Sequence, residues 1–147
     1  MVAIVAFDVD RVVGEVRNAA DVFLRPRFRS LAAGDVREKS PGEVVTIADE
    51  ECEAHLGAAL LAVVPGSVLV GEEAASQDGS LLELLAGDDP VWLLDPLDGT
   101  SAFAAGSSDY AVMAALVVRG ETVLSVIHQP EYGRTFVAER GSGAHEL

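Results

Sequence analysis

Two aspartates, Asp95 and Asp98, follow the apolar run Val91–Leu94, and a threonine comes directly after them in Asp95-Pro96-Leu97-Asp98-Gly99-Thr100. Two like charges about 4 Å apart repel by on the order of 4 kcal/mol at an effective dielectric near 20. A divalent cation reverses that repulsion, because hard cations take oxygen ligands. The alternative for this segment alone is a structural turn, since Asp, Pro and Gly favour turns for local reasons.

Two further segments bring carboxylates to the ends of expected elements. Gly71-Glu72-Glu73 follows a short apolar strand, and Thr46 and Asp49 stand at the start of a helix. Thr46 as a helix cap, with Asp49 completing a capping box, is the alternative for the second segment. Carboxylates that converge beside a hydroxyl are what metal-assisted phosphoryl hydrolysis requires: bridged metals, an activated water and a base.

The elements that must position these residues follow from apolar spacing. An amphipathic helix is expected from Val12 to about Arg25, where Pro26 ends it. An extended piece over 36–46 is broken by a turn at Ser40-Pro41-Gly42, and a second helix runs from Thr46 to the stop at Pro65-Gly66. A brief helix is expected over Ser80–Ala86, and short strands over 68–70, 91–94, 111–118, 122–128 and 135–139. This order predicts one α+β domain over residues 1–147, with N-terminal helices packed on a mostly antiparallel sheet.

Composition excludes several classes of function. The formal net charge of −14 argues against a nucleic-acid partner, because phosphate backbones are bound through Lys and Arg. Cys52 is the single cysteine, so an internal disulfide cannot form, which is compatible with the cytoplasm. The apolar start, Met1–Phe7, is too short to span a membrane and lacks a basic n-region. We therefore expect a soluble, cytoplasmic protein with no membrane partner.

The segment Asp95–Thr100, preceded by Trp92-Leu93-Leu94 and followed by Ser101 and Phe103, resembles the signature of the inositol monophosphatase family. Further matches lie in the family's order: Val45-Thr46-x-Ala48-Asp49, Gly71-Glu72-Glu73 and Gly141-x-Gly143-Ala144. The resemblance extends over essentially the whole chain. It implies the layered fold shared with fructose-1,6-bisphosphatase and the activity of a Mg²⁺-dependent, lithium-sensitive-type phosphatase of small molecules.

The resemblance also implies roles for individual residues. It assigns two or three Mg²⁺ per complete site, with Glu72, Asp95, Asp98 and the carbonyl of Leu97 as ligands. Glu72 and Thr100 would orient the attacking water, and Asp49 would support Thr100. Asp98 and the backbone amides of Gly99, Thr100 and Ser101 would bind the substrate phosphate. Lys39 matches a position near the metal site.

Length is the departure from the family pattern. Members are nearly twice as long, and their second α/β half carries a Trp-Asp motif; the only tryptophan here, Trp92, is followed by Leu93. The resemblance therefore implies the N-terminal half, with the C-terminal half missing, an apolar sheet face left exposed and activity impaired. Another chain supplying that half is an open alternative. A catalytically inactive metal-binding fragment is the competing hypothesis.

Inositol monophosphate is the substrate that the resemblance implies first. Histidinol phosphate, fructose bisphosphate and adenosine bisphosphate are open alternatives, and a homodimer is expected because members are typically dimers. A minor alternative rests on Asp8 and Asp10, whose surroundings resemble the opening motif of haloacid-dehalogenase-like phosphatases; there Asp8 would be the nucleophile, although Arg11 replaces the usual Gly.

Overall fold

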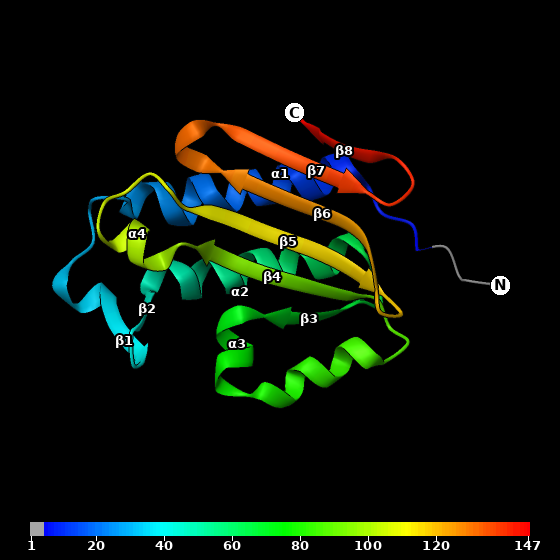
Figure 1. Ribbon diagram of the computed structural model, residues 1–147, viewed down its shortest axis with the longest axis horizontal. Helices are drawn as coiled ribbons and strands as arrows, with labels where there is room; N and C mark the ends of the chain where they lie inside the picture. The colour runs from blue at the N-terminus through cyan, green and yellow to red at the C-terminus, as the bar shows by residue number, and fades with distance from the viewer. Residues whose placement is uncertain (1–4) are drawn as a thin grey trace.

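A six-stranded sheet forms the centre of the computed structural model, which describes residues 5–147 (Figure 1). Its strands are ordered β3-β4-β5-β6-β7-β8; β3 and β4 are parallel and every other neighbouring pair is antiparallel. The strands are β3 (Val68–Gly71), β4 (Val91–Asp98), β5 (Ala111–Val118), β6 (Glu121–Gln129), β7 (Arg134–Glu139) and β8 (Gly143–Glu146). The predicted mostly antiparallel sheet is confirmed.

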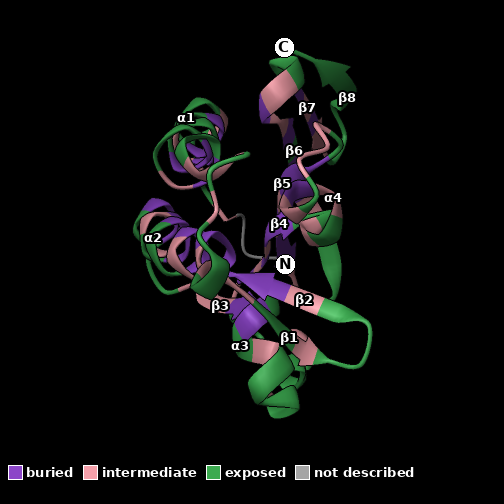
Figure 2. Ribbon diagram, turned by 90° about the vertical axis from the view of Figure 1, so that its left-hand side faces the viewer, coloured by how far each residue is buried: buried purple, intermediate pink, exposed green. Residues whose placement is uncertain are grey.

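Two helices, α1 (Val9–Ala19) and α2 (Ile47–Val63), lie side by side against one face of this sheet (Figure 2). After α1 the chain continues through a π-helical turn, Ala20–Leu24, and a 3₁₀ turn, Arg25–Arg27. Pro26 lies in that last turn, where its missing N–H and fixed φ end the helix. The α+β class and the helix end near Arg25 are confirmed.

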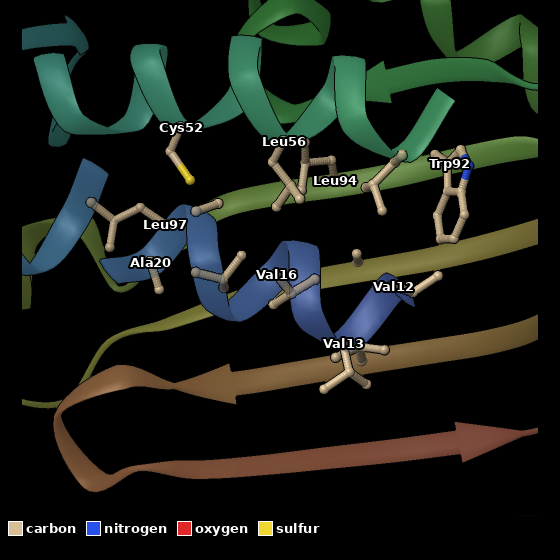
Figure 3. Close-up of a cluster of buried hydrophobic side chains, with 14 of the residues drawn as sticks. Val12, Val13, Val16, Ala20, Cys52, Leu56, Trp92, Leu94 and Leu97 are labelled. Carbon is tan, nitrogen blue, oxygen red and sulfur yellow. The ribbon is translucent and has the colours of Figure 1, made fainter. Parts of the chain in front are cut away.

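The main core fills the space between the helices and the sheet (Figure 3). Strand register places Trp92, Leu116 and Leu124 in one row that faces the helices. Side chains from the other elements close over it: Val12, Val16 and Ala20 from the first helical segment, Cys52, Leu56 and Leu60 from α2, and Leu94, Ala114, Val126 and Val137 from the next row of the sheet. Burying a Val or Leu side chain contributes about 1.5–3 kcal/mol. Cys52 is a buried free thiol, as expected.

A separate hairpin, β1 (Val36–Ser40) and β2 (Glu43–Thr46), leads into α2. The turn at Pro41 and Gly42 is confirmed, with Gly42 at φ +80°. Thr46 ends β2 and also caps α2, because its hydroxyl accepts from the amides of Ala48 and Asp49. The remaining short helical segments are Ala33–Asp35, α3 (Glu72–Gln77), Gly79–Ala86, α4 (Thr100–Ala104) and Pro130–Tyr132.

Three features differ from the predicted elements. Strand β4 continues to Asp98 instead of ending at Leu94, because a register shift between Asp95 and Asp98 accommodates Pro96, which cannot donate to the ladder. Glu72 and Glu73, which follow the predicted strand 68–70, open the short helix α3, where no helix was predicted. A final strand, β8, pairs with β7 where no strand was predicted.

The face of the sheet opposite α1 and α2 carries an apolar groove of about 570 Å³. Its lining includes Leu82, Leu93, Met113 and Ile127, and Leu82 and Ile127 are exposed by 54% and 38%. The expected exposed apolar sheet face is therefore present. Over residues 5–147, no helix has the length and apolarity that a membrane span requires.

Candidate functional site

A polar pocket of about 320 Å³ is lined by residues from the end of β4, from α3 and α4 and from the β1–β2 hairpin. Figure 1 shows where these elements lie. The side chains and backbone that line it belong to Lys39, Gly42, Glu43, Val44, Glu72, Asp95, Leu97, Asp98, Gly99, Thr100 and Ser101. Of the residues predicted from the sequence to form the site, all except Asp49 line this pocket. Asp49 is fully buried and hydrogen-bonds to Thr100.

The end of β4 places two carboxylates and a hydroxyl within one turn. The amide of Leu97 donates to Asp95 Oδ1 over 3.3 Å, within the register shift between Asp95 and Asp98. Gly99 then adopts φ +81°, and a Cβ there would lie 2.7 Å from the carbonyl oxygen of Asp109. Only glycine tolerates both constraints, so the chain can turn sharply and start α4 at Thr100.

Buried Asp49 organises the hydroxyls beneath the pocket. Its Oδ2 accepts from the amide and the hydroxyl of Thr46 over 2.8 and 2.6 Å, and its Oδ1 accepts from the Thr100 hydroxyl over 2.8 Å. The predicted capping box is thus confirmed, and the same carboxylate also holds a residue of the pocket. Burial raises the pKa of Asp49, although these hydrogen bonds oppose the rise.

Thr100 has a single hydroxyl hydrogen and two acceptors within reach. The distance is 2.8 Å to Asp49 Oδ1 and 3.0 Å to the carbonyl oxygen of Leu97. One hydrogen serves one acceptor at a time, and the shorter contact is to a carboxylate, which binds donors more strongly. While that hydrogen is held by Asp49, the Thr100 oxygen keeps lone pairs that can accept a hydrogen bond from a molecule in the pocket.

Glu72, the first residue of α3, borders the pocket from the other side. Its Oε1 lies 3.4 Å from Lys39 Nζ, which is also 3.4 Å from the carboxylate of the buried Glu73. Burial raises the pKa of Glu73 to about 7, and the ammonium of Lys39 opposes that rise. The ammonium of Lys39 therefore forms ion pairs with two neighbouring acids, and the Glu72 side chain is 41% exposed.

Negative charge accumulates around Asp95. Parallel pairing of β3 with β4 sets Gly71 opposite Leu94, so Glu72 and Asp95 come next to each other. Burial, the hydrogen bond to Glu72 and the charges of Glu72 and Asp98 all raise the pKa of Asp95 well above its usual range. Over residues 5–147, no three acidic, histidine or cysteine side chains converge as a complete cation cage. The carboxylates share a pocket without meeting at one point.

The structure adds one buried acid that the sequence patterns do not single out, Glu53 of α2. Its carboxylate accepts from the amides of Glu73 and Ala74 over 2.7 and 2.9 Å. A signal was available, because Glu53 follows Asp49 by four residues and shares its helix face.

Asp8 has a different role from the one that the haloacid-dehalogenase alternative requires. It caps α1, accepting from the amide of Arg11 over 3.2 Å, and it is exposed. It does not line the polar pocket. Asp8 therefore has a structural role, as the N-terminal cap of α1.

Comparisons with known proteins point to one family. The model of the inositol monophosphatase family matches residues 8–146. The histidinol-phosphatase of Chlorobaculum parvum is 39% identical over 116 residues, which cover 79% of this chain and 41% of that protein. The inositol-1-monophosphatase of Mycobacterium leprae is 39% identical over 117 residues, 79% and 40% of the two chains. Nus factor SuhB of Pseudomonas aeruginosa is 36% identical over 120 residues, 80% and 43%.

Solved structures show the same fold. The Thermotoga maritima IMPase superposes with a TM-score of 0.78 at 28% identity, covering 94% of this chain and 50% of that one. An IMPase/NADP phosphatase complexed with NADP and Ca²⁺ gives 0.76 at 19% identity, which shows the fold alone. The chain spans about half the length of these structures, and about two fifths of the three curated relatives named above. It belongs to the inositol monophosphatase family.

Proposed function

We propose that the polar pocket binds Mg²⁺ and hydrolyses a small phosphate monoester. The observation that carries the proposal is the pocket lining itself: Glu72, Asp95 and Asp98 face it beside Thr100, whose hydroxyl is held by buried Asp49. A pocket that bound no cation would gain nothing from this concentration of acids, because like charges in one pocket destabilise the fold.

The donor set fits a hard divalent cation. Glu72, Asp95 and Asp98 offer carboxylate oxygens, and the Leu97 carbonyl lies in the same lining. Mg²⁺ binds through few carboxylates and keeps several waters, so it does not require a cage closed entirely by protein. Lys39, near Glu72, already provides positive charge at one edge of the pocket.

Different residues of the pocket would have different roles in hydrolysis. When bound, a divalent cation supplies positive charge to the phosphate oxygens and makes water more acidic. Glu72 accepts a proton from the attacking water, and Thr100 accepts a hydrogen bond from it, since the Thr100 hydrogen is held by Asp49. Amides at the start of α4, in the lining segment Gly99–Ser101, lie where they can donate to phosphate. Asp98 lies next to them.

A small polar metabolite is the proposed substrate. The pocket volume of about 320 Å³ suits a molecule of that size, at the lower end for ligand sites. Relatives named histidinol-phosphatase and inositol-1-monophosphatase support an alcohol phosphate, with inositol monophosphate first and histidinol phosphate next. The acidic chain, at −14, requires that bound cations offset its repulsion of such an anion. A homodimer in the cytoplasm stays a prediction from the resemblance.

The competing hypothesis is a metal-binding chain without turnover. It is favoured by length, because the chain spans only about two fifths of its phosphatase relatives, and the remainder of those proteins has no counterpart among the matched residues. The apolar groove on the open sheet face also borders Glu72 and Asp95.

The deciding experiment combines metal binding with phosphate release from the chain 1–147. We expect release from inositol monophosphate or histidinol phosphate with Mg²⁺, and loss of that release in Asp98→Asn. Asp88→Asn is the matched control, because Asp88 is exposed and lies in the loop before β4. Mg²⁺ binding without release of phosphate from any substrate would favour the inactive metal-binding chain. Release that survives Asp98→Asn would contradict the proposed site.

A further inference from the structure

The buried face of α2 carries two carboxylates, Asp49 and Glu53, one helical turn apart. Residues four apart lie above each other on one face, separated by roughly 5–6 Å along the axis. Asp49 holds Thr100 at the start of α4, and Glu53 holds the start of α3. The two ends of the polar pocket are therefore both bonded to the same helix.

Glu53 binds α3 through both of its carboxylate oxygens. Oε1 accepts from the amide of Glu73 over 2.7 Å and Oε2 accepts from the amide of Ala74 over 2.9 Å. Amides in the first turn of a helix have no partner within the helix, and hydrogen bonds to an ionised acceptor are the strong kind. Glu53 is 8% exposed, so solvent cannot easily replace it as the acceptor.

Gly71 shows how closely Glu53 approaches the junction between β3 and α3. A Cβ at position 71 would lie 2.5 and 2.8 Å from the two carboxylate oxygens of Glu53. The backbone of Gly71 is extended, with φ −89°, so its conformation does not demand glycine. Glycine is required there because the carboxylate occupies the space of a side chain.

Glu72 lies between these two contacts. Its neighbour on one side, Gly71, packs against the Glu53 carboxylate, and its neighbour on the other, Glu73, donates to that carboxylate. Strand pairing already brings Glu72 next to Asp95. The direction of the first turn of α3, which Glu53 determines, then decides whether Glu72 faces the pocket.

We propose that Glu53 is a positioning residue that holds Glu72 at the pocket through the first turn of α3, so that α2 sets the spacing between Glu72 and Thr100. The inference rests on the proposed cation site. It differs from a purely stabilising helix cap in a measurable way. A cap alone lowers the free energy of unfolding and leaves the cation affinity of the folded protein unchanged.

The test measures Mn²⁺ dissociation constants by electron paramagnetic resonance, with unfolding midpoints for the same samples. In Glu53→Gln one carboxylate oxygen becomes an NH₂ group that faces an amide donor, so one of the two bonds is lost. We expect affinity to fall by about 10–100-fold, the range for residues that orient metal ligands. Glu51→Gln makes the same change on the same helix, where Glu51 pairs with Arg27, and should leave affinity unchanged.

A second control separates positioning from stability. Val63→Ala removes a buried side chain at the far end of α2, so it should lower the unfolding midpoint without changing the affinity for Mn²⁺. Gly71→Ala should weaken Mn²⁺ binding, because its Cβ displaces the Glu53 carboxylate. The double variant Gly71→Ala/Glu53→Ala should bind Mn²⁺ only slightly more weakly than Glu53→Ala alone, since the alanine at position 53 leaves room for the new Cβ.

A metal-independent measurement keeps the two proposals distinguishable. Hydrogen exchange at the amides of Glu73 and Ala74, followed by NMR without metal, should accelerate in Glu53→Gln and not in Glu51→Gln. If the wild-type protein bound no Mn²⁺ while exchange still accelerated in Glu53→Gln, the cation site would be refuted and the hold of Glu53 on α3 would be supported. Unchanged exchange, or Mn²⁺ affinity in Glu53→Gln equal to that of wild type, would overturn the positioning role.

Discussion

Two polar networks fasten the two long helices to neighbouring elements, and only one of them leads to a candidate site. Beneath α2, Asp49 joins the hydroxyls of Thr46 and Thr100. Beneath α1, Arg17 Nε donates to the Thr135 hydroxyl over 3.0 Å, and Thr135 Oγ1 lies 2.9 Å from His128 Nδ1. Each network crosses between segments far apart in the chain.

The difference between the networks lies in charge and in what borders them. The network beneath α1 joins a guanidinium, a hydroxyl and an imidazole, and its charge belongs to the exposed Arg17. The network beneath α2 contains a buried carboxylate and continues through Thr100 into a pocket that four further acidic residues line, Glu43, Glu72, Asp95 and Asp98. Hydrogen-bonded burial is therefore enough to fix a helix in place. Chemistry additionally requires charge that the protein leaves partly unneutralised beside an open pocket.

The largest effect is expected from Asp49→Asn. One oxygen that accepts a hydrogen bond becomes an NH₂ donor, so either Thr46 or Thr100 faces a donor inside the core. We expect a loss of about 2 kcal/mol in the free energy of unfolding, within the range for an unsatisfied buried group. We also expect turnover to fall by about 100-fold, because the Thr100 hydroxyl can then turn to the Leu97 carbonyl. Urea unfolding and phosphate release measure the two effects.

Thr100→Ser distinguishes the two consequences of that change. Serine keeps the hydroxyl that Asp49 binds, so turnover should stay closer to wild type than in Asp49→Asn. If Asp49→Asn lost stability but kept full turnover, the network beneath α2 would only stabilise the fold, as the network beneath α1 does. The contrast between the two networks would then be wrong.

Local chemistry made one part of this site predictable from the sequence. Thr46 and Asp49 form a capping box within four residues, so the start of α2 follows from sequence alone. Gly99 and Thr100 follow a recognisable turn, although Pro96 concealed that β4 continues through it. Such features depend on neighbours along the chain, which is where sequence patterns are informative.

The remaining part depends on contacts between distant segments. Glu72 lies beside Asp95 because β3 pairs in parallel with β4, and nothing within either segment specifies that register. Glu53 binds amides 20 and 21 residues further along the chain. Thr135 meets Arg17 across 118 residues. A residue at such a position looks in the sequence like an ordinary polar residue of a helix or strand.

A smaller effect is expected from Thr135→Val, which removes the hydroxyl at the centre of the network beneath α1. The substitution keeps the shape of a β-branched side chain in β7 but leaves His128 and Arg17 without their shared partner. We expect a loss of about 1 kcal/mol, measured by urea unfolding. Mn²⁺ affinity and turnover should not change. Thr122→Val, the same substitution at an exposed position of β6, is the matched control.

The smallest effect concerns the pH dependence of that network. Burial lowers the pKa of His128, and the charge of Arg17 lowers it further. Above the pKa of the unfolded chain, near 6.5, both states hold a neutral imidazole, so the contribution to stability is complete. As the pH falls from there toward the lower pKa of the folded state, only the unfolded chain binds the proton. The free energy of unfolding then decreases by at most about 1.4 kcal/mol per pH unit.

Comparison with His128→Gln isolates this dependence from that of the acids. The buried carboxylates Asp49 and Glu53 have raised pKa values, so their contribution to stability has the opposite sign and increases as the pH falls. These acids are present in both proteins and cancel in the difference between them. The free energy of unfolding of the wild type minus that of His128→Gln, from urea unfolding at pH 5 to 8, should be constant above about pH 6.5. Below that pH the difference should decline. A difference that rises on acidification would mean that His128 is protonated in the folded state, and the network beneath α1 would then carry buried charge like its counterpart beneath α2.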